Sequence, residues 1–243
     1  MSRLQDAFCA LAGRVERATT MADLQSAVRS TVEPFGLRHA VYHMMSLPGV
    51  SLDNPVLAFT YDPVWVEHYL KRNYAALDPV YLAGSRSVLP VEWEMLDRGP
   101  KRVRDFFEES IDAGVGRTGI SIPVRGPHGD QALFTVTSNL VGTDWAAFKR
   151  ENMGDIQLLA HYVHARYLAM TINKNEIVPD LSPREIDVLT WAAVGKSAVE
   201  TGVILGLSFR TVDAYLVSAR HKLTSITKTQ AVAKALRLGI IRP

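Results

Sequence analysis

A carboxylate and several aromatic side chains with polar tips lie close together in one short stretch of the sequence. Tyr61, Trp65 and Tyr69 precede Asp78, which is followed by Pro79. Trp65 and Tyr69 are four residues apart, so they share one face if the segment is helical. Hydroxyl, indole N–H and carboxylate groups among aromatic rings are typical of a small-ligand site. An ordinary core, in which Tyr and Trp bond to buried protein groups, would give the same pattern.

A second pair of polar side chains is predicted to lie on a β-hairpin. The apolar segments GISIPV and QALFTVTS flank the turn-forming segment RGPHGD, which is the pattern of two strands and a loop. If the loop centres on His128, Ser121 and Thr135 lie opposite each other, because both are equally far from that residue. Their hydroxyls would then share one face of the sheet. We expect this pair to contribute to the same site.

The remaining N-terminal pattern predicts the elements that position these residues. Apolar spacing favours helices at residues 4–15, 24–32, 64–74, 100–114 and 145–171, and strands at residues 39–45 and 55–61. Helices on both sides of consecutive antiparallel strands predict an α+β fold with an N-terminal α-β-α sandwich. This order disfavours a phosphoacceptor receiver domain, which alternates strands and helices. The single cysteine, Cys9, excludes a disulfide framework and is consistent with a reducing cytoplasm.

The C-terminal segment predicts an all-α domain of four helices. LSPRE and KSAVE each contain a capping box, Ser208 caps a third helix, and Thr229 begins a fourth. Only GLS separates the second helix from the third, which describes a helix-turn-helix. Residues 180–243 carry nine basic and five acidic side chains, whereas residues 1–179 carry 18 and 20. This imbalance favours polyanion binding at the C-terminal end, although a solvated surface would show it too.

Residues 181–236 resemble the helix-turn-helix domain of the LuxR family along their whole length, from LSPRE through GK and TV to KL and QAV. The resemblance implies DNA binding. We assign phosphate contacts to four polar side chains: Lys196, Ser208, Thr211 and Lys222. Four further side chains on the outward face of the third helix are predicted to contact DNA: Arg210, Asp213, Val217 and Arg220. Of these, Asp213 could accept a hydrogen bond from cytosine N4, and Val217 could contact a thymine methyl group. Asp213 stands where the family usually carries a basic or polar residue, so the operator sequence is not implied.

The N-terminal part resembles the acyl-homoserine-lactone-binding domain of LuxR-type quorum-sensing regulators. Six positions match in order: Trp65, Tyr69, Asp78, Pro79, Trp93 and Gly119. The resemblance implies that Trp65 donates to the lactone carbonyl, Asp78 accepts the amide N–H, and Tyr61 donates to the amide carbonyl. Ser121 and Thr135 would bind the same polar end or a 3-oxo group, directly or through water. Two rings would form walls: Tyr69 and Trp93.

We therefore expect an autoinducer-binding domain at residues 1–172, a linker at 173–180 and a DNA-binding domain at 181–243. The expected protein is a cytoplasmic transcription factor without a cofactor, and no nucleophile elbow or metal cluster indicates an enzyme. No run of about 18 apolar residues predicts a membrane span.

Expected partners are an acyl-homoserine lactone, promoter DNA, a second copy of the chain and RNA polymerase. A non-lactone signal, such as a plant metabolite, and a DNA binder with an empty cleft remain alternatives.

Overall fold

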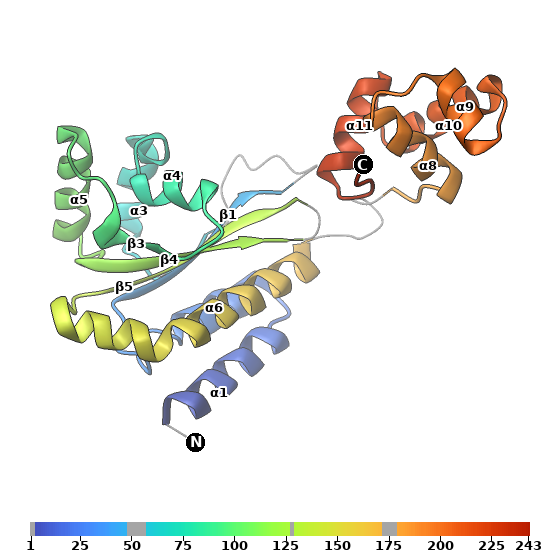
Figure 1. Cartoon of the computed structure of the whole chain (residues 1–243). Helices are drawn as coiled ribbons and strands as arrows, with labels where there is room; N and C mark the ends of the chain where they lie inside the picture. The colour runs from blue at the N-terminus through green and yellow to red at the C-terminus, as the bar shows by residue number, and fades with distance from the viewer. Residues whose placement is uncertain (1–2, 48–56, 127–128, 172–178) are drawn as a thin grey trace. The chain divides into compact units, whose positions relative to one another are not determined.

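The computed structural model describes residues 3–47, 57–126, 129–171 and 179–243 (Figure 1). The chain divides into two compact units, the larger ending at Thr171 and the smaller containing the C-terminal helices.

A five-stranded antiparallel sheet forms the centre of the larger unit. Its strands are β1 (His39–Ser46), β2 (Leu57–Phe59), β3 (Val91–Glu92), β4 (Thr118–Arg125) and β5 (Gln131–Ser138). They are arranged in the order β2-β1-β5-β4-β3. The strands predicted at residues 39–45 and in the hairpin are confirmed. β2 is shorter than the predicted strand at 55–61, and the beginning of that prediction lies outside the described residues.

The hairpin register agrees with the sequence prediction. Ser121 lies directly opposite Thr135, and Ile120 opposite Val136. His128, the predicted centre of the loop, lies outside the described residues. β4 and β5 are buried along nearly their whole length rather than on one face. Both faces of the sheet must therefore be covered, which explains why apolar residues run almost continuously through these strands.

Helices cover the two faces of the sheet and complete the predicted α-β-α sandwich (Figure 1). One layer contains α1 (Arg3–Arg17), α2 (Met21–Arg29) and the long α6 (Gly142–Thr171). The other contains α3 (Pro63–Lys71), α4 (Pro79–Arg86) and α5 (Lys101–Asp112), with the short 3₁₀ turns η1 (Tyr74–Ala76) and η2 (Trp93–Met95) beside them. On the α6 side, the core contains four large side chains that are fully buried: Tyr42, Phe134, Trp145 and Tyr167.

Two Asp-Pro pairs begin the helices that carry most of the predicted site. The carboxylate of Asp62 accepts the Val64 N–H at 2.8 Å at the start of α3, and the carboxylate of Asp78 accepts the Val80 N–H at 2.8 Å at the start of α4. Each aspartate is an N-cap, and the following proline needs no N–H at the first helical position. The sequence pattern predicts no helix directly after Asp78, because α4 is short and contains Gly84, a poor helix former.

The described part of the smaller unit contains four helices: α8 (Pro183–Ala193), α9 (Ala198–Leu205), α10 (Phe209–Lys222) and α11 (Lys228–Arg237). Both predicted capping boxes are present, and Gly206 ends α9 in a left-handed conformation (φ +67°) that favours glycine. The predicted start of the last helix at Thr229 is wrong. Thr227 is the N-cap, because its hydroxyl accepts the Gln230 N–H at 3.1 Å and leaves Thr229 inside the first turn.

No single helix in the described ranges is long and apolar enough to cross a membrane. Only α9 and α10 taken together pass that test of length and composition, and their axes are bent by 107°.

Candidate functional site

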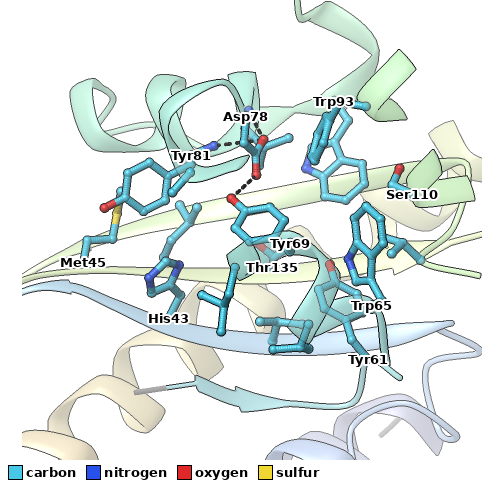
Figure 2. A pocket seen from close by; sticks show the side chains of 18 of the residues that line it. His43, Met45, Tyr61, Trp65, Tyr69, Asp78, Tyr81, Trp93, Ser110 and Thr135 are labelled. Atoms are coloured by element: carbon cyan, nitrogen blue, oxygen red, sulfur yellow. Dashed lines mark hydrogen bonds between the residues drawn. The ribbon is translucent and has the colours of Figure 1, made fainter. Parts of the chain in front are cut away.

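A cavity of about 250 Å³ lies between the sheet and the helices α3, α4 and α5 (Figure 2). Its wall is mainly apolar and aromatic, with contributions from a buried cluster that includes Trp65, Trp93, Phe106 and Phe107. Six of the seven residues predicted to bind ligand line it: Tyr61, Trp65, Tyr69, Asp78, Trp93 and Thr135. An enclosed apolar space with a few polar groups is what a small-ligand site requires.

The carboxylate of Asp78 is a hydrogen-bond acceptor on the wall of this cavity. One carboxylate oxygen accepts the Tyr69 hydroxyl at 2.9 Å, and the other accepts the backbone N–H groups of Val80 at 2.8 Å and Tyr81 at 3.4 Å. Burial raises the pKa of Asp78 to about 6, although these hydrogen bonds act to lower it. A carboxylate offers about four acceptor sites. At least one therefore remains for a donor inside the cavity.

Two hydrogen-bond donors on the cavity wall have no partner among the described residues: the indole N–H of Trp65 and the hydroxyl of Tyr61. The Trp65 ring is held by Tyr69, Tyr74 and Phe106, with ring centroids 6.2–6.3 Å away. Burial, with a smaller contribution from Asp78, raises the pKa of Tyr61, so its hydroxyl keeps its proton. Among the residues predicted to bind ligand, the cavity thus presents two free donors and one charged acceptor.

Ser121 lies behind the cavity wall. The Trp93 indole donates to its hydroxyl at 3.1 Å, and that hydroxyl lies 2.8 Å from the Thr135 hydroxyl. Ser121 is fully buried and does not line the cavity, whereas Thr135 does. Gly119 lets Trp93 approach the sheet, because a Cβ at this position would lie 2.6 Å from two atoms of the indole. This arrangement fixes the ring that closes one side of the cavity.

Several lining residues were missed by the sequence analysis, among them His43, Tyr81 and Ser110. The alternation of β1 places His43 on the same face as Val41, and this signal was available in the sequence. Tyr81 could not be placed, because α4 was not predicted. Tyr69 was expected only as a wall, but its hydroxyl also bonds to Asp78.

The opposite face of the sheet carries a separate buried polar cluster. The Tyr42 hydroxyl lies 2.8 Å from His164 Nδ1, and His164 Nε2 lies 2.5 Å from the Asp130 carboxylate. These contacts join β1 to α6 and the hairpin. Within the described ranges, no group of three or more His, Cys, Asp or Glu side chains could hold a metal ion.

In the smaller unit, α10 has a buried side and an exposed side. Val212, Ala219 and Leu223 are fully buried against the other helices. Arg210, Asp213 and Val217 are exposed on the same helix. Arg220 is partly buried and donates to the Ile226 carbonyl oxygen at 3.2 Å. Ser208 caps the helix by accepting the Thr211 N–H at 3.1 Å, and the two hydroxyls lie 2.8 Å apart.

Two of the predicted phosphate contacts form ion pairs within this unit. Lys196 contacts Glu200 at 3.4 Å on the surface, and Lys222 contacts Glu185 at 2.9 Å. Glu185 is buried and also accepts the Ser218 hydroxyl at 2.6 Å. Burial acts to raise the pKa of Glu185, but the hydrogen bonds outweigh it and lower the pKa to about 2. Lys222 therefore stabilises a buried carboxylate, and its contact with phosphate stays a prediction.

Two families of known proteins match separate parts of the chain. Residues 20–167 match the family described as "Autoinducer binding domain", and residues 179–235 match "Bacterial regulatory proteins, luxR family". The transcriptional activator protein RaiR of Rhizobium etli is 42% identical over 185 residues, 76% of each chain. The quorum sensing-dependent regulator RpaR of Rhodopseudomonas palustris is 34% identical over 207 residues, 83% of this chain and 82% of RpaR.

The fold is also that of a solved structure. Escherichia coli SdiA matches with a TM-score of 0.70 and 20% identity, over 97% of this chain and 98% of SdiA. The relatives are transcriptional regulators and not enzymes. The chain belongs to the LuxR family of quorum-sensing transcriptional regulators, with an autoinducer-binding domain followed by a helix-turn-helix DNA-binding domain.

Proposed function

We propose that this protein binds an N-acyl-homoserine lactone in the cavity of the larger unit and controls transcription by binding promoter DNA as a dimer. The observation that carries the proposal is the match in hydrogen-bonding groups. The polar head of such a ligand has two carbonyl acceptors and one amide donor. Among the residues predicted to bind ligand, the cavity offers two donors without a described partner, on Trp65 and Tyr61, and one acceptor, on Asp78.

Each polar group of the ligand then has its own counterpart. Trp65 donates to the lactone carbonyl, Tyr61 donates to the amide carbonyl, and Asp78 accepts the amide N–H. Thr135 lies on the same wall and serves the polar end, while Ser121 holds Thr135 and Trp93 in place. The apolar remainder of the cavity receives the acyl chain, and each buried methylene adds about 0.8 kcal/mol. The polar head thus determines which class of ligand binds, and the acyl chain of the ligand supplies much of the affinity.

A non-lactone signal is the second candidate. The observation that favours it is that Asp78 already accepts three hydrogen bonds from the protein, one from Tyr69 and two from the start of α4. Most acceptor sites of this carboxylate are therefore filled by the protein itself, so a ligand without an amide donor would leave only about one of them unpaired.

Thermal unfolding of the full chain distinguishes the two candidates. A ligand that binds only the folded protein at a concentration of 100 times its Kd stabilises it by about 2.7 kcal/mol. We expect acyl-homoserine lactones to raise the melting temperature, and analogues methylated at the amide nitrogen to have no effect, because they lack the donor. No shift with any acyl chain length would contradict the lactone proposal.

Ligand affinity should depend on pH through Asp78. Burial raises its pKa from 3.8 to about 6 in the ligand-free protein, while its hydrogen bonds act to lower it. The amide N–H needs the ionised carboxylate, so a proton competes with the ligand. We expect Kd, measured by calorimetry, to rise as the pH falls from about 7.5 to about 5, approaching tenfold per pH unit below the pKa. Asp78→Asn should show no such dependence.

The raised pKa of Asp78 also makes the free energy of unfolding, measured without ligand, depend on pH. Between about pH 4 and pH 6 the folded state binds a proton at Asp78 that the unfolded state has released. The contribution of this group to the free energy of unfolding therefore decreases as the pH rises through that window.

For the DNA-binding part, the proposal places α10 in the major groove, with a second copy on the other half-site. Leu158 on α6 and Leu236 on α11 are large apolar side chains that are 48% and 43% exposed, and they support α6 and α11 as dimer surfaces. The proposal includes action in the cytoplasm, where promoter DNA lies, and contact with RNA polymerase.

Arg210 provides a test of the DNA contact. Its side chain is exposed and forms no hydrogen bond or ion pair with the described residues; its guanidinium carbon lies 5.9 Å from the centroid of the Phe209 ring. If Arg210 contacts phosphate, Arg210→Gln should reduce the slope of log K against log salt by about 0.9 in a fluorescence-anisotropy titration. Arg14→Gln removes the same charge from the exposed surface of α1 and should leave the slope unchanged. Equal slopes for all three proteins would exclude a phosphate contact of Arg210.

A further inference from the structure

One end of the cavity carries polar groups that the proposed headgroup contacts do not use. Figure 2 shows His43, Met45 and Tyr81 gathered on one side, opposite Trp65 and Trp93. The rings of His43 and Tyr81 face each other with centroids 5.2 Å apart and planes tilted by 37°. Neither the His43 imidazole nor the Tyr81 hydroxyl has a hydrogen-bond partner among the described residues.

The sheet fixes the position of this pair relative to the headgroup site. Val41 is the partner of Thr135 in the β1–β5 ladder, and His43 is the partner of Leu133. Because a strand rises about 3.3 Å per residue, His43 lies roughly 7 Å beyond Val41 along the cavity floor. It therefore lies past the Thr135 end, where a ligand held at Asp78 would extend its acyl chain.

Helix α4 closes the cavity above His43. A Cβ on Gly84 would lie 2.6 Å from the Leu133 side chain, so α4 packs closely on the sheet at this point. Tyr81 is on the same helix, one turn before Gly84, and its backbone N–H contacts Asp78. The tyrosine ring is thus held by the same element that carries the headgroup acceptor.

Both polar groups are neutral at physiological pH. Burial lowers the pKa of His43 to about 4 and raises the pKa of Tyr81. A neutral imidazole has one donor and one acceptor, and a phenol can be either. The pair therefore fits an uncharged oxygen, such as a hydroxyl or a carbonyl, better than a carboxylate or an ammonium group.

Resting on the proposed function, we propose that His43 and Tyr81 form a specificity subsite for an oxygen carried by the acyl chain. The preferred autoinducers are then lactones with a hydroxyl or carbonyl group on that chain. An unsubstituted chain leaves the two polar groups unpaired in an apolar wall, which should weaken binding by about tenfold or more.

The test compares ligands of one chain length on the full protein. Calorimetric Kd values are measured for octanoyl-homoserine lactone, the 3-oxo form, and isomers hydroxylated at carbon 3 and at positions farther from the amide. The proteins are the wild type, His43→Leu and Tyr81→Phe, with His68→Leu as the matched control. His68 is on α3 and does not line the cavity; it contacts Glu109, and its ring packs against Trp65 with centroids 5.8 Å apart. His68→Leu can therefore change headgroup binding, but it should do so equally for all the acyl chains.

We expect the best oxygenated chain to bind the wild type and His68→Leu about tenfold more tightly than the unsubstituted chain. In His43→Leu and Tyr81→Phe this ratio should fall toward one, because the oxygenated chain loses a hydrogen-bond partner and the unsubstituted chain no longer leaves that polar group unpaired. Tyr81→Phe retains the ring, so it reports on the hydroxyl even if His43→Leu folds poorly. The subsite is overturned if the wild type binds the unsubstituted chain more tightly than every oxygenated chain, or if the ratio is unchanged in both variants. Either result leaves the proposed function standing. Failure of every lactone to bind the wild type overturns both.

Discussion

Asp78→Asn weakens the binding of an acyl-homoserine lactone by about 10- to 150-fold, because a hydrogen bond to a charged group contributes about 1.5–3 kcal/mol. The substitution keeps the shape of the side chain but removes the charged acceptor from the cavity. Asparagine is as good an N-cap as aspartate, so α4 should still begin at this position. Calorimetry gives the affinity, and circular dichroism and thermal unfolding check the fold.

Asp62→Asn is a matched control for this variant. Asp62 also precedes a proline and caps a helix through the N–H two residues later, but it is exposed and does not line the cavity. The same chemical change at Asp62 should leave the affinity unaltered. If Asp78→Asn bound the lactone as tightly as Asp62→Asn does, the carboxylate at residue 78 would not be the amide acceptor.

Gly119→Ala destabilises the protein by about 1–3 kcal/mol and abolishes the stabilisation by ligand. The added Cβ would lie 2.6 Å from the Trp93 indole. β4 is held in ladders on both sides, by β3 and β5, so the indole must move rather than the strand. Movement of Trp93 breaks its hydrogen bond to Ser121 and displaces one wall of the cavity. Melting curves with and without lactone measure both effects.

Gly154→Ala controls for the general effect of replacing a glycine. Gly154 lies in α6, where an added Cβ would meet no atom within 4 Å. Alanine is the better helix former, so this variant should gain about 0.4–1 kcal/mol and keep its response to ligand. A Gly119→Ala protein that melted at the wild-type temperature and still responded to lactone would show that Trp93 does not shape the site.

The parts of the fold that depend on local rules were predictable from the sequence. The register that joins Ser121 to Thr135 follows from the symmetry of the hairpin about its loop. The two capping boxes of the DNA-binding unit depend on residues three positions apart, and both are present. The α-β-α order followed in the same way from the succession of helical and strand patterns.

Contacts between distant residues could not be predicted. Glu185 and Lys222 are 37 residues apart, and nothing near either one indicates that the lysine stabilises a buried carboxylate. The indole of Trp93 bonds to Ser121 across 28 residues and places that hydroxyl behind the wall instead of on it. The bond from Tyr69 to Asp78 depends on α4, a helix too short for its apolar pattern to be recognised.

The most direct test of the account is a crystal structure of the full protein with a bound acyl-homoserine lactone. We expect the ligand amide nitrogen about 2.7–3.2 Å from the Asp78 carboxylate, and the lactone carbonyl oxygen at a similar distance from the Trp65 indole nitrogen. The acyl chain should extend along the sheet toward His43. A ligand whose amide faces away from Asp78, or one bound outside this cavity, would contradict the account.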